Sequence, residues 1–132
     1  MRRSPGNAER EGQPIRLGTL EAQVMDVLWD HGPATIREVI THLPAQPAYT
    51  TIATVLSNLE RKDMVDAQRE GRFVRHRARV SREQHTAATM GHALDASSDR
   101  AASILHFVQA IPESDRELLR QYLQDSDGTV SL

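Results

Sequence analysis

The feature that most constrains this chain is an apolar pattern of helical period that gives way, near its middle, to a short segment of a different kind. Before that segment, apolar residues recur every three or four positions in three stretches: Leu20, Val24, Val27 and Leu28; Ile36, Val39, Ile40 and Leu43; and Ile52, Val55, Leu56 and Leu59. Residues 64–68 and 73–78 then predict two short strands, joined over residues 69–72, where Gly71 supplies the positive φ of a turn. Three further helical stretches follow. The fold class is therefore expected to be mainly α with a small β-hairpin.

Capping residues predict where the helices begin. We expect the first helix to start at the N-cap Thr19, and the second to open with a capping box formed by Thr35 and Glu38. The third is expected to start at Thr50 or Thr51. In the second half, a capping box over residues 81–84 opens a helix that runs to about residue 96, and further helices are expected over residues 99–110 and 112–124.

Three helices followed by a hairpin, with one short turn between the second and third helices, form the order of a winged helix-turn-helix. We expect this winged helix, a DNA-binding domain, over residues 17–80, and a three-helix dimerisation region over residues 81–124. Residues 1–16 are expected to be a flexible tail, and residues 125–132 a frayed one.

Composition excludes several classes of protein. The 132-residue chain has no cysteine, so it holds no disulfide, thiolate metal site or catalytic thiol. Its apolar runs are too short to span a membrane, and its polar N-terminus is not a secretory signal, so a cytoplasmic location is expected. Enzyme motifs are absent. His85 and His92 lie seven residues apart with no carboxylate at ligand spacing, so we predict no metal, no cofactor and no enzymatic activity.

Positive charge is concentrated in one segment. The formal net charge is −2, yet residues 61–82 carry eight of the sixteen basic side chains and only three acidic ones. Such a cluster is typical of a surface that binds a polyanion, although a solvated hairpin is the alternative. Within it, the candidate phosphate-binding side chains are Arg61, Lys62, Arg69, Arg72, Arg75 and Arg77.

The third helix has a polar face suited to reading DNA. With its apolar stripe buried, the opposite face carries small side chains and no acid before Glu60: Thr50, Thr51, Ala53, Thr54, Ser57 and Asn58. Short hydrogen-bonding groups fit the major groove, and a threonine methyl packs on the thymine methyl. An indifferent helix surface is the alternative. Thr35, at the start of the second helix, is a candidate phosphate contact as well as a cap.

The C-terminal helices carry more apolar side chains than three short helices can hide. Leu94, Ile104, Leu105, Phe107, Val108, Leu118, Leu119, Tyr122 and Leu123 make up this set. We predict that they form a dimer interface, which a helix-turn-helix protein needs on a two-fold operator. Packing within the chain is the alternative.

Over three quarters of the chain resembles the BlaI/MecI/CopY group of bacterial penicillinase-type repressors. The segments that carry this resemblance are residues 20–29 (LEAQVMDVLW), 35–39 (TIREV) and 49–59 (YTTIATVLSNL). The resemblance implies a homodimeric repressor that binds inverted repeats with TACA/TGTA-like half-sites. Its base-reading positions fall on Thr50, Thr51, Ala53, Thr54 and Asn58. Many relatives carry Arg or another long side chain at the positions of Ala53 and Asn58, so the resemblance does not define the exact operator.

The resemblance also bears on how the protein is induced. Copper-sensing members carry a C-terminal cysteine cluster, which this chain lacks. Penicillin-responsive members are cleaved in the fifth helix by a membrane sensor-protease system, and the matching bond here is His106–Phe107. The alternative function from another class is a winged-helix protein-interaction module whose basic hairpin meets an acidic protein.

Overall fold

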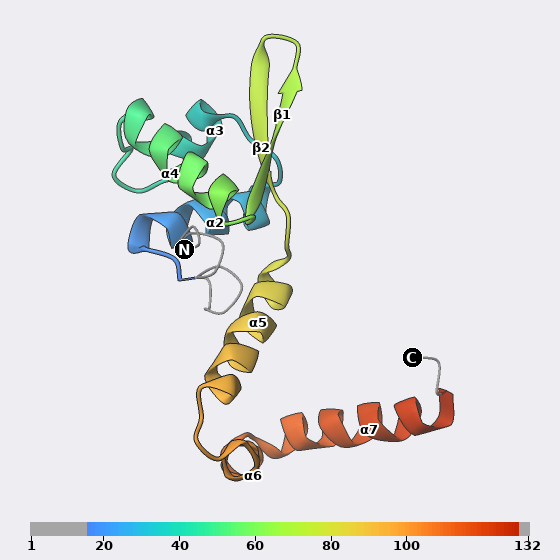
Figure 1. Ribbon diagram of the computed structural model, residues 1–132. Coiled ribbons are helices and arrows are strands. Elements are labelled where there is room, and N and C mark those ends of the chain that lie inside the picture. The colour runs from blue at the N-terminus through green and yellow to red at the C-terminus, as the bar shows by residue number, and fades with distance from the viewer. Residues whose placement is uncertain (1–15, 130–132) are drawn as a thin grey trace, which may run out of the picture. The chain divides into compact units, whose positions relative to one another are not determined.

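The computed structural model describes residues 16–129, which form six helices and one two-stranded antiparallel sheet (Figure 1). In chain order the elements are α2 (Thr19–His31), α3 (Ile36–Thr41), α4 (Tyr49–Arg61), β1 (Val65–Glu70), β2 (Phe73–Ala78), α5 (Arg82–Asp95), α6 (Arg100–Ala110) and α7 (Glu113–Thr129). The predicted fold class is confirmed. The chain divides into two compact units between His92 and Ala93, so most of α5 belongs to the same unit as the winged helix.

One aliphatic core holds α2, α3, α4 and the hairpin together. The predicted stripes of α2 and α4 face it, and Leu20, Ile36 and Ile40 lie at its margin, half-buried. Met25 and Met64, which are not part of the predicted apolar stripes, are fully buried in it as well. Burying such a side chain contributes about 1.5–3 kcal/mol. The core therefore fixes which face of α4 stays in solvent.

The hairpin is longer than expected. Arg69 pairs with Val74 and Glu70 pairs with Phe73, so both strands reach the turn and only Gly71-Arg72 remains as the loop. The prediction of a four-residue connection over residues 69–72 was wrong. Gly71, with a φ of 62°, closes a hairpin turn of only two residues.

The hairpin is also attached to the loop between α2 and α3. The Ala34 amide donates to the His76 carbonyl at 2.9 Å, and the His76 amide donates to the Ala34 carbonyl at 2.8 Å. These two bonds dock β2 against the helices.

Several helix ends differ by a few residues from the prediction. The N-cap of α2 is Gly18 rather than Thr19, and its amide donates to the Glu21 carboxylate at 2.9 Å. Helix α4 begins at Tyr49. Helix α7 continues to Thr129 rather than ending near residue 124.

The expected tails fall largely outside the structure. Residues 1–15 and 130–132 lie outside the described residues. Arg16 is the one described member of the expected N-terminal tail, and its carbonyl accepts a hydrogen bond from the Lys62 ammonium at 2.8 Å. Within residues 16–129, no helix has the length and hydropathy needed to cross a bilayer.

The C-terminal unit lacks a core of its own. None of the described side chains over residues 93–126 is buried. Its clearest internal link is Arg116 of α7, which donates to the carbonyls of Val108 and Ile111 at 3.1 and 3.2 Å. These bonds satisfy carbonyl groups at the end of α6 and hold the corner between α6 and α7.

Candidate nucleic-acid interface

The exposed face of α4 is the first part of the candidate interface. Because Ile52, Val55, Leu56 and Leu59 are buried, Thr50, Thr51, Thr54 and Ser57 are exposed, with Ala53 and Asn58 half-buried beside them. The first turn carries no acidic residue. The orientation expected of this helix is confirmed, whereas base reading by these side chains stays a prediction.

Two residues that sequence analysis did not select border this face. The Arg37 guanidinium lies 5.4 Å from the centroid of the Tyr49 ring, a cation–π contact between α3 and the first residue of α4. A shallow hollow of about 210 Å³ lies beside them and reaches the end of the hairpin, lined by Thr35, Ile36, Arg37, Tyr49, Arg72, Phe73 and Val74. The start of α3, the start of α4 and the hairpin turn thus meet at one place.

Acidic side chains form ion pairs with the two arginines of β2, Arg75 and Arg77, and with Arg79, which follows the strand. Arg75 contacts Glu38 of α3 at 2.9 Å and Glu70 of β1 at 3.1 Å. The remaining pairs are Arg77–Asp66 at 3.6 Å, Arg79–Asp63 at 3.5 Å and Arg79–Asp66 at 3.5 Å. The positive charge of Arg75, Arg77 and Arg79 is therefore largely neutralised by neighbouring carboxylates.

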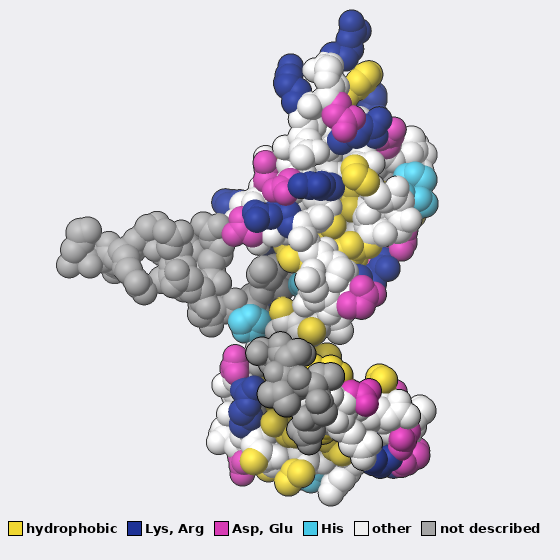
Figure 2. All heavy atoms as spheres, turned by 90° about the vertical axis from the view of Figure 1, so that its right-hand side faces the viewer, with side chains coloured by type: hydrophobic (Ala, Val, Ile, Leu, Met, Phe, Trp, Pro, Cys, Tyr) yellow, Lys and Arg dark blue, Asp and Glu magenta, His cyan; other side chains and the backbone are white. Residues whose placement is uncertain are grey.

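Arg69 and Arg72 differ from those arginines. In the part of the chain that the structure describes, neither side chain has an ion pair or a hydrogen bond. Arg72 lies in the two-residue turn and Arg69 near the end of β1, and Figure 2 shows Lys and Arg side chains gathered at that end of the molecule. The free positive charge of the hairpin thus lies at its tip, which sequence analysis could not separate from the rest.

Lys62 serves the fold. Its ammonium lies 2.9 Å from the Glu21 carboxylate and also bonds the Arg16 carbonyl. Burial raises the pKa of Glu21, but the hydrogen bonds from Lys62 and from the Gly18 amide outweigh it, so the pKa lies below its usual value.

The Asn58 amide oxygen accepts from the Arg61 guanidinium at 2.7 Å. These two predicted DNA contacts therefore touch each other.

Thr35 is a complete cap. Its hydroxyl accepts from the Glu38 amide at 3.2 Å, and its own amide donates to the Glu38 carboxylate at 2.9 Å. That backbone hydrogen bond, supported by Arg75, lowers the pKa of Glu38 and keeps it charged. A phosphate at Thr35 would meet an anion already in place.

His76 lies under the hairpin. The residue is 7% exposed, and its Nδ1 atom has no hydrogen-bond partner. Burial lowers its pKa, and the nearby Glu60 opposes this only in part. His76 is accordingly a neutral side chain of the core at the point where β2 meets Ala34.

The histidines of α5 do not converge with other ligands. Nowhere in residues 16–129 do three His, Asp or Glu side chains come together as a metal site. His85 instead lies beside Trp29 of α2, with ring centroids 6.0 Å apart.

The residues predicted to form a dimer interface lie on the surface of the C-terminal unit. Leu94 and Val108 are half-buried, while five other residues of the predicted interface are exposed: Ile104, Leu105, Phe107, Leu119 and Tyr122. Leu118 and Leu123 are exposed as well, at 66% and 62%. The His106–Phe107 bond lies inside α6, four residues from its end.

Comparison with known proteins places the chain among regulators. The sequence profile described as penicillinase repressor matches residues 17–125. The chain is 37% identical over 119 residues to a protein named transcriptional regulator BlaI in two strains of Mycobacterium tuberculosis, covering 86% of this chain and 86% of each relative.

Solved structures are similar at a lower level. A transcriptional regulator from Thermotoga maritima matches with a TM-score of 0.48 and 12% identity, covering 86% of this chain and 76% of that one. A MarR family protein from Bacillus stearothermophilus matches with a TM-score of 0.47 and 14% identity, covering 96% and 83%.

Proposed function

The chain belongs to the penicillinase repressor family, whose members are transcriptional regulators and not enzymes, and on that premise we propose that it binds an inverted-repeat operator as a homodimer and represses transcription there. The observation that carries the proposal is the acid-free, threonine-rich face of α4, which lies in solvent because the opposite face is buried. A major groove accepts a helix of this kind.

The proposed contacts with DNA are of two kinds, to base edges and to phosphates. Thr50, Thr51 and Thr54, with Ala53 and Asn58, meet base edges in TACA/TGTA-like half-sites. The phosphate contacts come from Thr35, Arg61, Lys62, Arg72, Arg75 and Arg77. Among these, Arg72 is the strongest candidate, because its guanidinium has no partner in the described chain. Arg75 and Lys62 would have to exchange carboxylates for phosphate, and the Thr35 amide would have to release the Glu38 carboxylate.

The dimer forms through the C-terminal unit. Its exposed apolar side chains, among them Leu105, Phe107 and Tyr122, can be removed from water only by packing against a partner surface. A second copy of the same face is the partner that a two-fold operator requires.

Release follows cleavage at His106–Phe107 by a membrane sensor-protease system. Phe107 is 48% exposed, yet the bond lies in a hydrogen-bonded helix, so α6 has to open locally before a protease can bind it. Fragments mapped after incubation with an induced cell extract test this step. Derepression with the chain intact would contradict it.

The test of DNA binding is fluorescence anisotropy with a TACA/TGTA inverted-repeat duplex and a scrambled duplex, at two salt concentrations. We expect tight, salt-sensitive binding that favours the repeat. Thr54→Ala should cost about 1–3 kcal/mol on the repeat and little on the scrambled duplex, because it reads bases. Equal losses on both duplexes would remove Thr54 from base reading, and no binding to either would favour a protein partner.

A further inference from the structure

A cluster of side chains joins α2 to the beginning of α5 and is not used by the proposed DNA contacts. The Arg82 guanidinium lies 3.0 Å from the Asp30 carboxylate and 3.3 Å from that of Asp26. It also lies 5.1 Å from the centroid of the Trp29 ring. The indole Nε1 of Trp29 in turn donates to the Val80 carbonyl at 2.9 Å.

These contacts fix a direction as well as a position. Asp26 and Asp30 are one helical turn apart on α2, so one guanidinium spans a full turn. Hydrogen bonds to the two carboxylates, that to Asp30 first, stabilise the charged guanidinium and raise the pKa of Arg82. Because Val80 is bonded just before the helix begins, α5 is held at its first turn from two sides.

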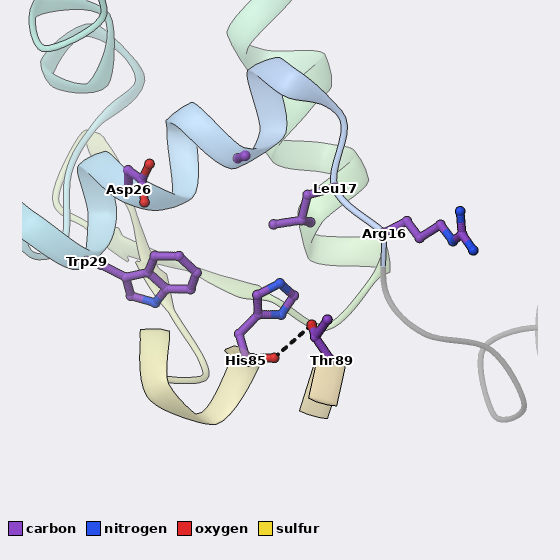
Figure 3. Close-up of a pocket in the computed structure, with 7 residues that line it drawn as sticks. Arg16, Leu17, Asp26, Trp29, His85 and Thr89 are labelled. Atoms are coloured by element: carbon purple, nitrogen blue, oxygen red, sulfur yellow. Dashed lines mark hydrogen bonds between the residues drawn. The ribbon is translucent and has the colours of Figure 1, made fainter. Parts of the chain in front are cut away.

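Beyond that first turn, α5 is weakly held. None of its side chains is buried. Trp29 and His85 border an open hollow of about 570 Å³, while Thr89 bonds the carbonyl of His85 within its own helix (Figure 3). The hollow offers α5 little to pack against. The contacts of Arg82 and Trp29 therefore carry most of the attachment.

The length of α5 makes this attachment sensitive. Its 14 residues span about 21 Å. A rotation of about 10° at the first turn would move the far end by roughly 3.5 Å, which is about one base-pair step along DNA. A dimer joined beyond α5 would transmit this movement to the distance between its two recognition helices.

We propose that Arg82 is a positioning residue that sets the angle at which α5 leaves the winged helix, and with it the half-site spacing that the dimer accepts. This inference rests on the proposed function, since it assumes a dimer on an inverted repeat. Arg82 itself touches no DNA in this proposal. Its effect passes through Asp26, Asp30 and Trp29.

The first experiment measures binding of the full chain to operators with identical half-sites and central spacers of different length. We expect the wild type to lose about tenfold in affinity for each base pair away from its best spacing, and Arg82→Gln to flatten this profile to within about threefold. Affinity for a single half-site and the dimer mass stay unchanged. Arg82→Lys restores part of the profile. A wild-type profile in Arg82→Gln would overturn the proposal.

Arg79→Gln is the matched control. It removes one arginine with two carboxylate partners from the same basic segment, but Arg79 pairs with Asp63 and Asp66 rather than with α2. Its spacing profile is expected to match the wild type. A flattened profile in this control as well would overturn the assignment to Arg82.

A second experiment needs no DNA. The chain has no cysteine, so spin labels can be attached only at introduced cysteines. We choose the exposed positions Gln23→Cys on α2 and Ala88→Cys on α5. Unlabelled protein is added to suppress distances between the two chains of a dimer. We expect a narrow distance distribution that broadens in Arg82→Gln, and an unchanged distribution would overturn the proposal. If the wild type shows no preference for the repeat at any spacing, the proposed function fails, while the spin labels still decide the role of Arg82.

Discussion

The winged-helix unit buries its large apolar side chains, whereas the C-terminal unit leaves them exposed. In the first, α2, α3, α4 and the hairpin enclose Met25, Ile52, Leu56, Leu59 and Met64 almost completely. In the second, large apolar side chains of α6 and α7 remain exposed and no described side chain is buried. The first unit has what it needs to fold alone. The second is completed, in the proposed dimer, by another copy of the chain.

The largest expected effect comes from separating the two units. A chain that ends after His92 should remain folded, because the core lies before that point, but it should be monomeric and bind the operator about a hundredfold to a thousandfold more weakly. Light scattering and anisotropy measure both properties. A truncated chain that still bound the operator tightly would refute the role of the C-terminal unit.

A pair of leucine substitutions compares the units directly. Leu56→Ala, at a site 1% exposed, should lower the free energy of unfolding of the winged helix by about 2–5 kcal/mol. Leu118→Ala, at a site 66% exposed, should leave that unfolding unchanged and weaken the dimer. Denaturant titration and sedimentation measure the two effects. Equal destabilisation of the winged helix by both substitutions would contradict the expected difference between the two units.

Lowering the pH should destabilise the winged-helix unit. Burial lowers the pKa of His76, so below about pH 6.5 the unfolded chain binds a proton that the folded chain does not. The free energy of unfolding should therefore fall with decreasing pH in that range, by at most about 1.4 kcal/mol per pH unit.

The pH series has a matched pair of variants. His76→Leu should reduce this slope, whereas His106→Gln, an exposed histidine of the C-terminal unit, should preserve it. Thermal unfolding of the winged-helix unit at several pH values gives the slope. Retention of the full slope in His76→Leu would assign it to other groups.

The smallest expected effect separates the two kinds of hairpin arginine. Arg72→Gln should weaken binding to all DNA alike and reduce the log–log salt slope by about one, because its guanidinium is free to bind phosphate. Arg75→Gln should reduce it less, since Glu38 and Glu70 already neutralise Arg75. Anisotropy across a salt series tests this, and a larger effect of Arg75→Gln would place the main phosphate contact on β2.

Much of the fold follows from local pattern. The apolar stripes located α2, α3 and α4, and the cap Thr35 lies where predicted, because a helix end depends on a few neighbouring residues. The hairpin loop was misjudged because the alternation of its strands is weak. Helix α7 ran beyond its expected end because polar residues without proline do not stop a helix by themselves.

The sequence by itself determined the order of the elements, the solvent face of α4 and the family. Only the tertiary structure decided which charged groups are free, since Glu38 meets Arg75 and Lys62 meets Glu21 across 37 and 41 residues of chain. It also joined Trp29 to Val80 and Arg82 to α2. The physical reason is that burial pattern is a local property of a helix or strand, whereas an ion pair or a joint requires two distant segments to meet.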